Sequence, residues 1–242
     1  MSTLLLRLAG PFQSWGTQSR FSVRDTGREP SKSGVIGLLC AALGRPRTEP
    51  LDDLAALRRG VRVDQEGALQ RDYQTAGGTH RRDEEYGVAH ADGGTGGTVT
   101  SARYYLADAD FLVGLAGSGQ DQEALLRDLD DALARPIWPL CLGRKAFVPG
   151  VPVRLPDQAP NGPGLHREAL REVLQRHHWP ERAGGARLRF VFETEPTVTA
   201  ELRADVPISF APGARQYATR AVETMFLERV RESKEARTES SR

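Results

Sequence analysis

The sequence predicts an α+β fold, and three observations lead to this prediction. Apolar runs of strand length and segments of helical spacing follow each other as strand, helix, strand, strand, helix over the first 140 residues. The 39% of hydrophobic residues among 242 suffice for one large domain or two small ones. With 33 Lys+Arg against 32 Asp+Glu, the chain has the charge balance of a globular protein rather than a disordered one.

The first elements are marked by apolar runs and by the residues that end them. Residues 3–9 form a strand-length apolar run, and the loop 10–16 that follows is punctuated by Gly and Pro. Apolar residues within 35–43 follow the i, i+3, i+4, i+7 spacing of a helix. Ser33 is the expected N-cap of this helix and Gly44 its C-terminal stop.

The next segment predicts a short helix, two strands and an insertion. Residues 51–59 are expected as the helix, and the strands over 61–63 and 69–73 are joined by a turn at Gly67. Residues 74–98 contain seven glycines and almost no large apolar side chain. We therefore expect 74–98 to be a flexible insertion rather than part of the core.

The second half of the chain completes the predicted fold. We expect strands over 102–107 and 111–115, a helix over 122–134, a helix over 165–177, and strands over 187–193 and 202–209. The element order of the first 140 residues is that of a ferredoxin-like fold. The predicted domains are residues 1–140 and a smaller β-rich domain over 141–227, followed by a disordered tail over 228–242.

The near-neutral total charge hides a segregated distribution. Residues 1–47 carry seven Lys/Arg and two acids, and residues 136–156 carry three Lys/Arg and no acid. Residues 107–135 carry two Arg and seven acids. Such separation predicts one basic face for a polyanion and one acidic face for a protein neighbour.

Several classes of site are not predicted. The five histidines lack metal-ligand spacing, Cys40 and Cys141 lie far apart, and no nucleophile elbow is present, so we expect no metal and no cofactor. Gly34 and Gly37 have the spacing of a phosphate clamp, but they fall within the helical apolar stripe, where close packing explains them better. No apolar run approaches the roughly 18 to 20 residues of a membrane span, and no signal peptide is seen, so a cytoplasmic protein is expected.

Arginine and aromatic residues are interleaved in the expected loops. Phe12, Trp15 and Arg24 form one such group, and Arg103 and Tyr104 belong to another. Unpaired RNA bases stack on aromatic and guanidinium planes while basic groups hold the phosphates. The pattern therefore indicates single-stranded RNA as a ligand. The alternative for each aromatic residue is that it covers the hydrophobic core and binds nothing.

The order of five segments resembles a known family. They are LRLAGPFQSWG (6–16), TGREPSKSGVIGLL (26–39), RDYQT (71–75), RYYLADADFLV (103–113) and PLCLGRKAFVP (139–149). Together they are similar to the CasD family of subunits from type I-E CRISPR Cascade complexes, which belongs to the RAMP superfamily. The resemblance spans residues 1 to about 220.

The resemblance implies a modified ferredoxin-like (RRM-like) RAMP domain with an inserted β-hairpin thumb over about 73–106 and a smaller C-terminal β-rich domain. It implies a non-catalytic antiviral-defence subunit that binds the 5′ handle of CRISPR RNA. The subunit would cap the backbone assembly, in contact with the backbone subunit CasC and the large subunit CasA, and would meet target DNA only through the complex.

The same resemblance places the RNA contacts. We expect the handle to be bound by the first-strand loop, the start of the first helix and the LGRKAFVP segment, and the thumb to hold the junction between handle and guide. The expected contacts are Gln13, Ser14, Trp15, Arg24, Lys32, Ser33, Arg144 and Lys145 for the handle, and Tyr73, Gln74, Thr75, Arg103 and Tyr104 for the thumb.

Two other functions remain open at this stage. A repeat-RNA endoribonuclease could use Tyr73, His80 and Lys145 as general base or acid and phosphate stabiliser. A pure protein scaffold would leave the basic blocks without a ligand.

Overall fold

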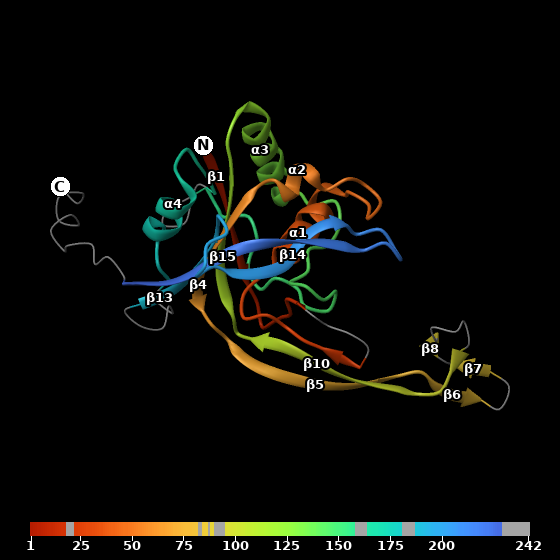
Figure 1. Ribbon diagram of the computed structural model, residues 1–242. Helices are drawn as coiled ribbons and strands as arrows, with labels where there is room; N and C mark the ends of the chain where they lie inside the picture. Colours follow the sequence, from red (N-terminus) through yellow and green to blue (C-terminus); the bar gives the residue numbers. More distant parts are fainter. Residues whose placement is uncertain are drawn as a thin grey trace.

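The chain folds around one large antiparallel sheet (Figure 1). The structure, a computed structural model, describes residues 1–17, 22–81, 84–86, 88–89, 95–157, 164–180 and 187–228. The sheet has the order β12-β1-β11-β4-β13-β15-β14, and every neighbouring pair is antiparallel. Its strands are β1 (Ser2–Ala9), β4 (Arg58–Gln65), β11 (Asp110–Gly117), β12 (Leu165–His166), β13 (Arg187–Thr194), β14 (Glu201–Ser209) and β15 (Gln216–Glu228).

Helices cover both faces of this sheet. They are α1 (Lys32–Leu43), α2 (Asp52–Ala55), α3 (Gln120–Ala134) and α4 (Leu170–Arg176). In β1, Leu4, Leu6 and Leu8 point into the core beneath α1 and α3, whereas Leu5 points into the second core with α4. The continuous apolar run of β1 is therefore explained by burial of both faces, because successive side chains alternate across a strand.

The first helix starts earlier than expected. Ser31 rather than Ser33 is the N-cap, and its hydroxyl accepts from the Gly34 amide at 3.2 Å. A carboxylate oxygen of Asp205 accepts from the Lys32 amide at 2.8 Å, which fixes the first turn one residue upstream of Ser33. Gly44 ends the helix with φ +68°, as the sequence predicts.

Other predicted elements change at their ends. The helix expected over 51–59 is confined to α2, because Arg58 and Arg59 already belong to β4. The helix expected over 165–177 begins only at Leu170, since β12 pairs with β1. The strand β15 was not predicted at all.

The chain crosses the expected domain boundary within the same sheet. β13 pairs with β4 over Arg189 to Phe192, so strands from both sides of residue 140 are hydrogen-bonded neighbours. The division into two domains stays a prediction, and residues 229–242 lie outside the described residues. No described helix is long and apolar enough to cross a membrane.

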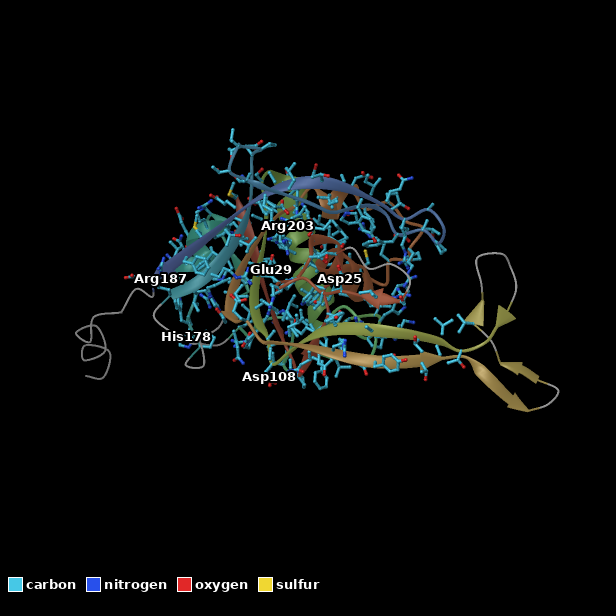
Figure 2. The ribbon with its side chains drawn as sticks, turned by 60° about the horizontal axis from the view of Figure 1, so that its bottom comes forward. Asp25, Glu29, Asp108, His178, Arg187 and Arg203 are labelled. Carbon is cyan, nitrogen blue, oxygen red and sulfur yellow. The ribbon has the colours of Figure 1, made fainter. Side chains whose placement is uncertain are left out.

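A long hairpin projects from the body of the molecule (Figures 1 and 2). Its stem is formed by β5 (Ala68–Ala76) and β10 (Val99–Ala107), which pair over their whole length. At the base, β10 also pairs with β2 (Phe12–Gln13), and halfway along the stem it pairs with β3 (Val23–Arg24). The short strands β6 (Gly78–Arg81), β7 (Glu84–Tyr86), β8 (Val88–Ala89) and β9 (Thr95–Gly96) lie beyond the stem. The expected insertion thus contains strands, and its flexibility stays a prediction.

Candidate nucleic-acid interface

The register of the stem divides the expected thumb residues between its two faces. Tyr73 lies opposite Ala102, and Arg103 lies opposite Asp72. Because residues directly opposite each other share a face and neighbours along a strand alternate, Tyr73, Thr75 and Tyr104 belong to one face. Gln74 and Arg103 belong to the other face. The sequence analysis expected these five residues to act together on RNA. The register shows that they do not lie on one surface.

Three arginines gather on the Arg103 face of the stem. Arg24 pairs with Arg103 in the parallel β3–β10 ladder, so the two side chains leave the sheet on the same side. The Arg144 Nη2 group donates a hydrogen bond to the Tyr104 carbonyl oxygen at 2.9 Å. The same group lies 3.4 Å from the Arg24 carbonyl oxygen. Burial lowers the pKa of Arg144, and the nearby Arg103 guanidinium lowers it further. We call Arg24, Arg103 and Arg144 the arginine cluster.

The loop that carries Arg144 is fixed by a close approach to the first-strand loop. Ser14 donates its amide to the Leu142 carbonyl oxygen at 3.1 Å. Gly143 has φ +90°, and a Cβ there would lie 1.7 Å from the Ser14 carbonyl oxygen. Only glycine fits this position, since it tolerates positive φ and brings no Cβ. Arg144 and Lys145 are held at the base of the hairpin by this contact.

An aromatic cluster packs between the same segments. Phe12, Tyr105 and Phe147 have ring centroids 5.1 to 5.9 Å apart, and the Arg144 guanidinium lies 5.5 Å from the Phe147 ring centre. Phe12 remains 45% exposed. The arginine cluster therefore lies beside an exposed ring, a combination that suits an unstacked base.

Two expected RNA contacts lie inside the protein instead. Gln13 is fully buried, and its Nε2 group donates to the carbonyl oxygens of Leu8 and Ala109. The Trp15 ring is also buried, and its indole N–H donates to Gln13 Oε1 at 3.1 Å. Both side chains use their polar groups within the fold, so the structure gives them a role in positioning the loop rather than in direct contact.

The start of α1 also differs from the expected phosphate site. Lys32 is buried, its Nζ lies 3.1 Å from Glu193 Oε2, and burial lowers the pKa of its ammonium group. The Lys32 amide already donates a hydrogen bond to the Asp205 carboxylate, and the Gly34 amide donates one to the Ser31 hydroxyl. A carboxylate at this helix end opposes a phosphate there, so neither the Lys32 ammonium nor most of the first-turn amides are available to RNA.

A buried ionic network accounts for this arrangement. Arg220 makes two hydrogen bonds to Asp205, at 2.6 and 2.9 Å, and Glu29 pairs with Arg189 and Arg203. Figure 2 labels Glu29 and Arg203, which form one of these ion pairs. The network fastens the segment before α1 to β13, β14 and β15. These acids and bases therefore stabilise the scaffold of the site and are not part of its ligand-binding surface.

A cationic cleft of about 730 Å³ opens beside α1. Four of the expected contacts, Ser14, Trp15, Ser33 and Lys145, line it, together with Gly34. A Cβ on Gly34 would lie 2.8 Å from the Trp15 ring, which supports close packing rather than a phosphate clamp as the reason for this glycine. Within the described ranges of the chain, no acidic residue lines this cleft.

The far side of the cleft was missed by the sequence reading. Three further arginines and three aromatic residues come from the segment after α1, the 137–139 segment and the connection between β14 and β15; they are Arg45, Arg47, Trp138, Phe210, Arg215 and Tyr217. Arg45 and Arg47 belong to the basic block 1–47, so the charge distribution of the sequence could have pointed to them. Arg215 and Tyr217 had no such signal, because the strand that carries Tyr217 was not predicted. Among the described residues no cluster of His, Cys, Asp and Glu could hold a metal ion.

Comparison with known proteins assigns the family. A family model described as CRISPR-associated protein (Cas_Cas5) matches residues 3–223. The chain belongs to this Cas5 family. The Cas5 chain is 31% identical over 209 residues to the CRISPR system Cascade subunit CasD of Escherichia coli (strain K12), covering 82% of this chain and 90% of that protein. The sequence-based resemblance to CasD subunits is confirmed.

Solved structures agree with this assignment. A protein described as "Crystal structure of Cas protein" is 40% identical and superimposes with a TM-score of 0.69, covering 94% of the Cas5 chain and 95% of its own. A chain of a "CRISPR RNA-guided surveillance complex" is 35% identical, with a TM-score of 0.70 and coverage of 93% and 90%. The mixed, mostly antiparallel fold of this Cas5 chain is thus shared with known Cas proteins.

Proposed function

We propose that the protein is a non-catalytic subunit of a CRISPR surveillance complex of the Cascade type, and that it binds the 5′ handle of CRISPR RNA. The relative from Escherichia coli is a Cascade subunit, and a similar chain belongs to an RNA-guided complex. By the same likeness, the subunit caps the backbone assembly and contacts the subunits corresponding to CasC and CasA. Target DNA reaches it only through the complex.

The arginine cluster is the observation that carries this proposal. Three guanidinium groups come together from β3, β10 and the 142–147 loop, and the cluster lies beside the exposed ring of Phe12. Guanidinium groups bind phosphate oxygens with paired hydrogen bonds. The cluster and the cleft meet at the 142–147 loop, because Arg144 belongs to the first and Lys145 lines the second. We assign the handle to this combined surface.

The topology supports a ferredoxin-like domain as the scaffold. The strand order β12-β1-β11-β4, with α1 between β1 and β4 and α3 between β11 and β12, fits the β-α-β-β-α-β arrangement. The β5–β10 hairpin is inserted between its second and third strands, in the position of a thumb. We propose that β13, β14 and β15 are the C-terminal β-rich addition to this domain.

The geometry favours binding over cleavage. Cleavage of RNA through its 2′-hydroxyl requires a base that takes the hydroxyl proton and a group that stabilises the charge on the phosphate, both placed around one reacting centre. Tyr73 lies on the face of the stem opposite to Arg103. The side chain of His80 lies outside the described residues, and Lys145 lines the cleft. The endoribonuclease alternative predicts a site-specific cut in repeat RNA that is lost in Tyr73→Phe or Lys145→Ala; we expect the RNA to stay whole.

Filter binding of repeat-derived RNA tests the proposal. The Arg24→Gln/Arg103→Gln variant removes two cations and leaves the Arg144 hydrogen bond in place. Each lost contact to single-stranded RNA should reduce the slope of log K against log salt by about 0.7, so two contacts give about 1.4. The matched control is Arg127→Gln/Arg135→Gln, at two exposed positions within α3 and directly after it. An unchanged affinity and slope in the first variant would refute the RNA site, and equal losses in both variants would indicate non-specific attraction.

A further inference from the structure

The outer edge of the hairpin is an unprotected strand edge. β5 pairs with β10 on one side, and no other strand in the described part of the chain pairs with it. Figures 1 and 2 show β5 on the side of β10 that faces away from the body. All but one of its nine residues are exposed, including Tyr73 at 67% and Leu69 at 43%. A row of backbone N–H and C=O groups is thus left facing outward.

The edge of the main sheet is built differently. β14 is the last strand there, and it carries Pro207 together with two shifts of register against β15. Proline and bulges are devices that prevent an edge from pairing with another chain. β5 has neither device, since its nine residues contain no proline and its register with β10 has no shift. Of these two edges in the described part of the chain, the hairpin edge is therefore the one suited to pairing.

We propose that the β5 edge binds an extended strand of a neighbouring protein subunit by strand addition. This inference builds on the proposed assembly into a complex, but it assigns a protein partner to a surface outside the RNA site. The outward groups of a strand alternate between donor and acceptor pairs, repeating every ~6.8 Å at ~3.4 Å per residue. Another peptide strand matches both kinds of group, whereas the phosphate oxygens of RNA only accept and would leave the carbonyls unpaired.

The side chains of β5 define the chemistry of the partner strand. Leu69, Arg71 and Tyr73 lie on one face, and Asp72 on the other face is opposite Arg103 of β10. Arg71 and Asp72 cancel in charge, so this edge has no net attraction for a polyanion. The partner strand should lack proline, place an apolar or β-branched residue beside Tyr73, and place a carboxylate beside Arg71.

Amide hydrogen exchange at residue resolution tests the pairing. The chain is compared alone, with repeat RNA, and in the protein complex purified from its native cells. The outward amides of β5, which are every second residue, should exchange rapidly in the first two samples and more than about tenfold more slowly in the complex. Protection by RNA alone, or no protection in the complex, would overturn the proposal. A chain that purifies without a protein partner and keeps open amides would overturn it as well, while RNA binding is measured separately on the same sample.

Proline substitution separates backbone pairing from side-chain contact. Adjacent residues of a strand direct their amides to opposite sides, so Arg71→Pro and Asp72→Pro each remove a donor from a different edge. One variant should lose the hairpin, and the other should keep the hairpin and RNA affinity but reduce assembly more than about tenfold. Arg71→Ala and Asp72→Ala are the controls, because they keep the backbone amides; Asp72→Ala should assemble normally, and Arg71→Ala should weaken assembly by at most about fivefold through the loss of one exposed ion pair. Equal loss in the alanine variants, or concentration-dependent pairing of the chain with itself, would refute a partner strand.

Discussion

Replacing Gly143 by alanine tests how the RNA site is positioned. A Cβ at this residue would lie 1.7 Å from the Ser14 carbonyl oxygen, where real Cβ atoms stay at least 3.0 Å away. The loop would have to move by more than about 1 Å, and the hydrogen bond from the Ser14 amide to Leu142 would be lost. The backbone strain of φ +90° costs about 1 to 3 kcal/mol and the hydrogen bond about 0.5 to 1.5 kcal/mol. We therefore expect Gly143→Ala to lower the free energy of unfolding by about 2 to 4 kcal/mol.

The same variant should weaken RNA binding. Arg144 and Lys145 follow Gly143 directly, so displacement of the loop withdraws both cations. The slope of log K against log salt should fall by about 1.4 if two contacts to single-stranded RNA are lost. Urea unfolding measures the first effect and filter binding at several salt concentrations measures the second.

Gly119→Ala is the matched control for this experiment. Gly119 also has positive φ, at +85°, but nothing lies within 4 Å of the position of its Cβ. This variant should show the backbone strain alone and should bind RNA normally. If Gly143→Ala unfolds like Gly119→Ala and keeps the salt slope of the native chain, the close approach does not position the site and our reasoning is refuted.

Three further predictions address the scaffold. Lys32→Met should cost about 1 to 3 kcal/mol of unfolding free energy, because it leaves Glu193 Oε2 without its hydrogen-bond donor while Arg220 Nη1 stays 3.5 Å from Oε1; RNA affinity at a temperature where the variant is folded should be unchanged, and a selective loss of affinity would restore Lys32 as a contact. Burial and then Arg62 lower the pKa of His177 from 6.5 to about 3, so between these values the unfolded chain binds a proton that the folded chain does not. The free energy of unfolding should thus fall on acidification below pH 6.5, by at most about 1.4 kcal/mol per pH unit. Urea unfolding at several pH values measures this effect, and the midpoint should fall less steeply with acid in His177→Gln than in the native chain. Deleting residues 78–97 should leave the melting temperature of the chain nearly unchanged but impair assembly; loss of the fold would show that the insertion stabilises the core.

The sequence predicts well those elements whose apolar residues follow one clear spacing. The stripe in 35–43 and the stop at Gly44 predict α1, and the apolar runs predict β1 and β11. β15 escaped prediction because its exposed polar residues interrupt the apolar ones near the charged end of the chain. A strand of this kind is specified by its pairing with β13 and β14, which no local pattern reveals.

The structure brings the first-strand loop, Arg24, Arg103 and the LGRKAFVP segment together, although the resemblance assigned Arg103 to the thumb and the others to the handle. Their contact with RNA stays a prediction. We expected Lys32 to contact RNA because it stands at the start of a predicted helix, where backbone amides favour phosphate. Its partner Glu193 lies 161 positions away, and such long-range pairs cannot be recognised from one sequence. The same holds for the alternation of faces along β5 and β10, which depends on their register.

Photo-cross-linking of the chain to repeat-derived RNA, with the linked peptides identified by mass spectrometry, tests the central claim most directly. We expect links in three segments: 12–24, 100–107 and 142–147. We also expect that the exposed acidic face of α3 stays unlinked, because its carboxylates repel phosphates. Links confined to α3 and α4, or none in the three segments under conditions where the RNA is bound, would contradict the assignment of the RNA site.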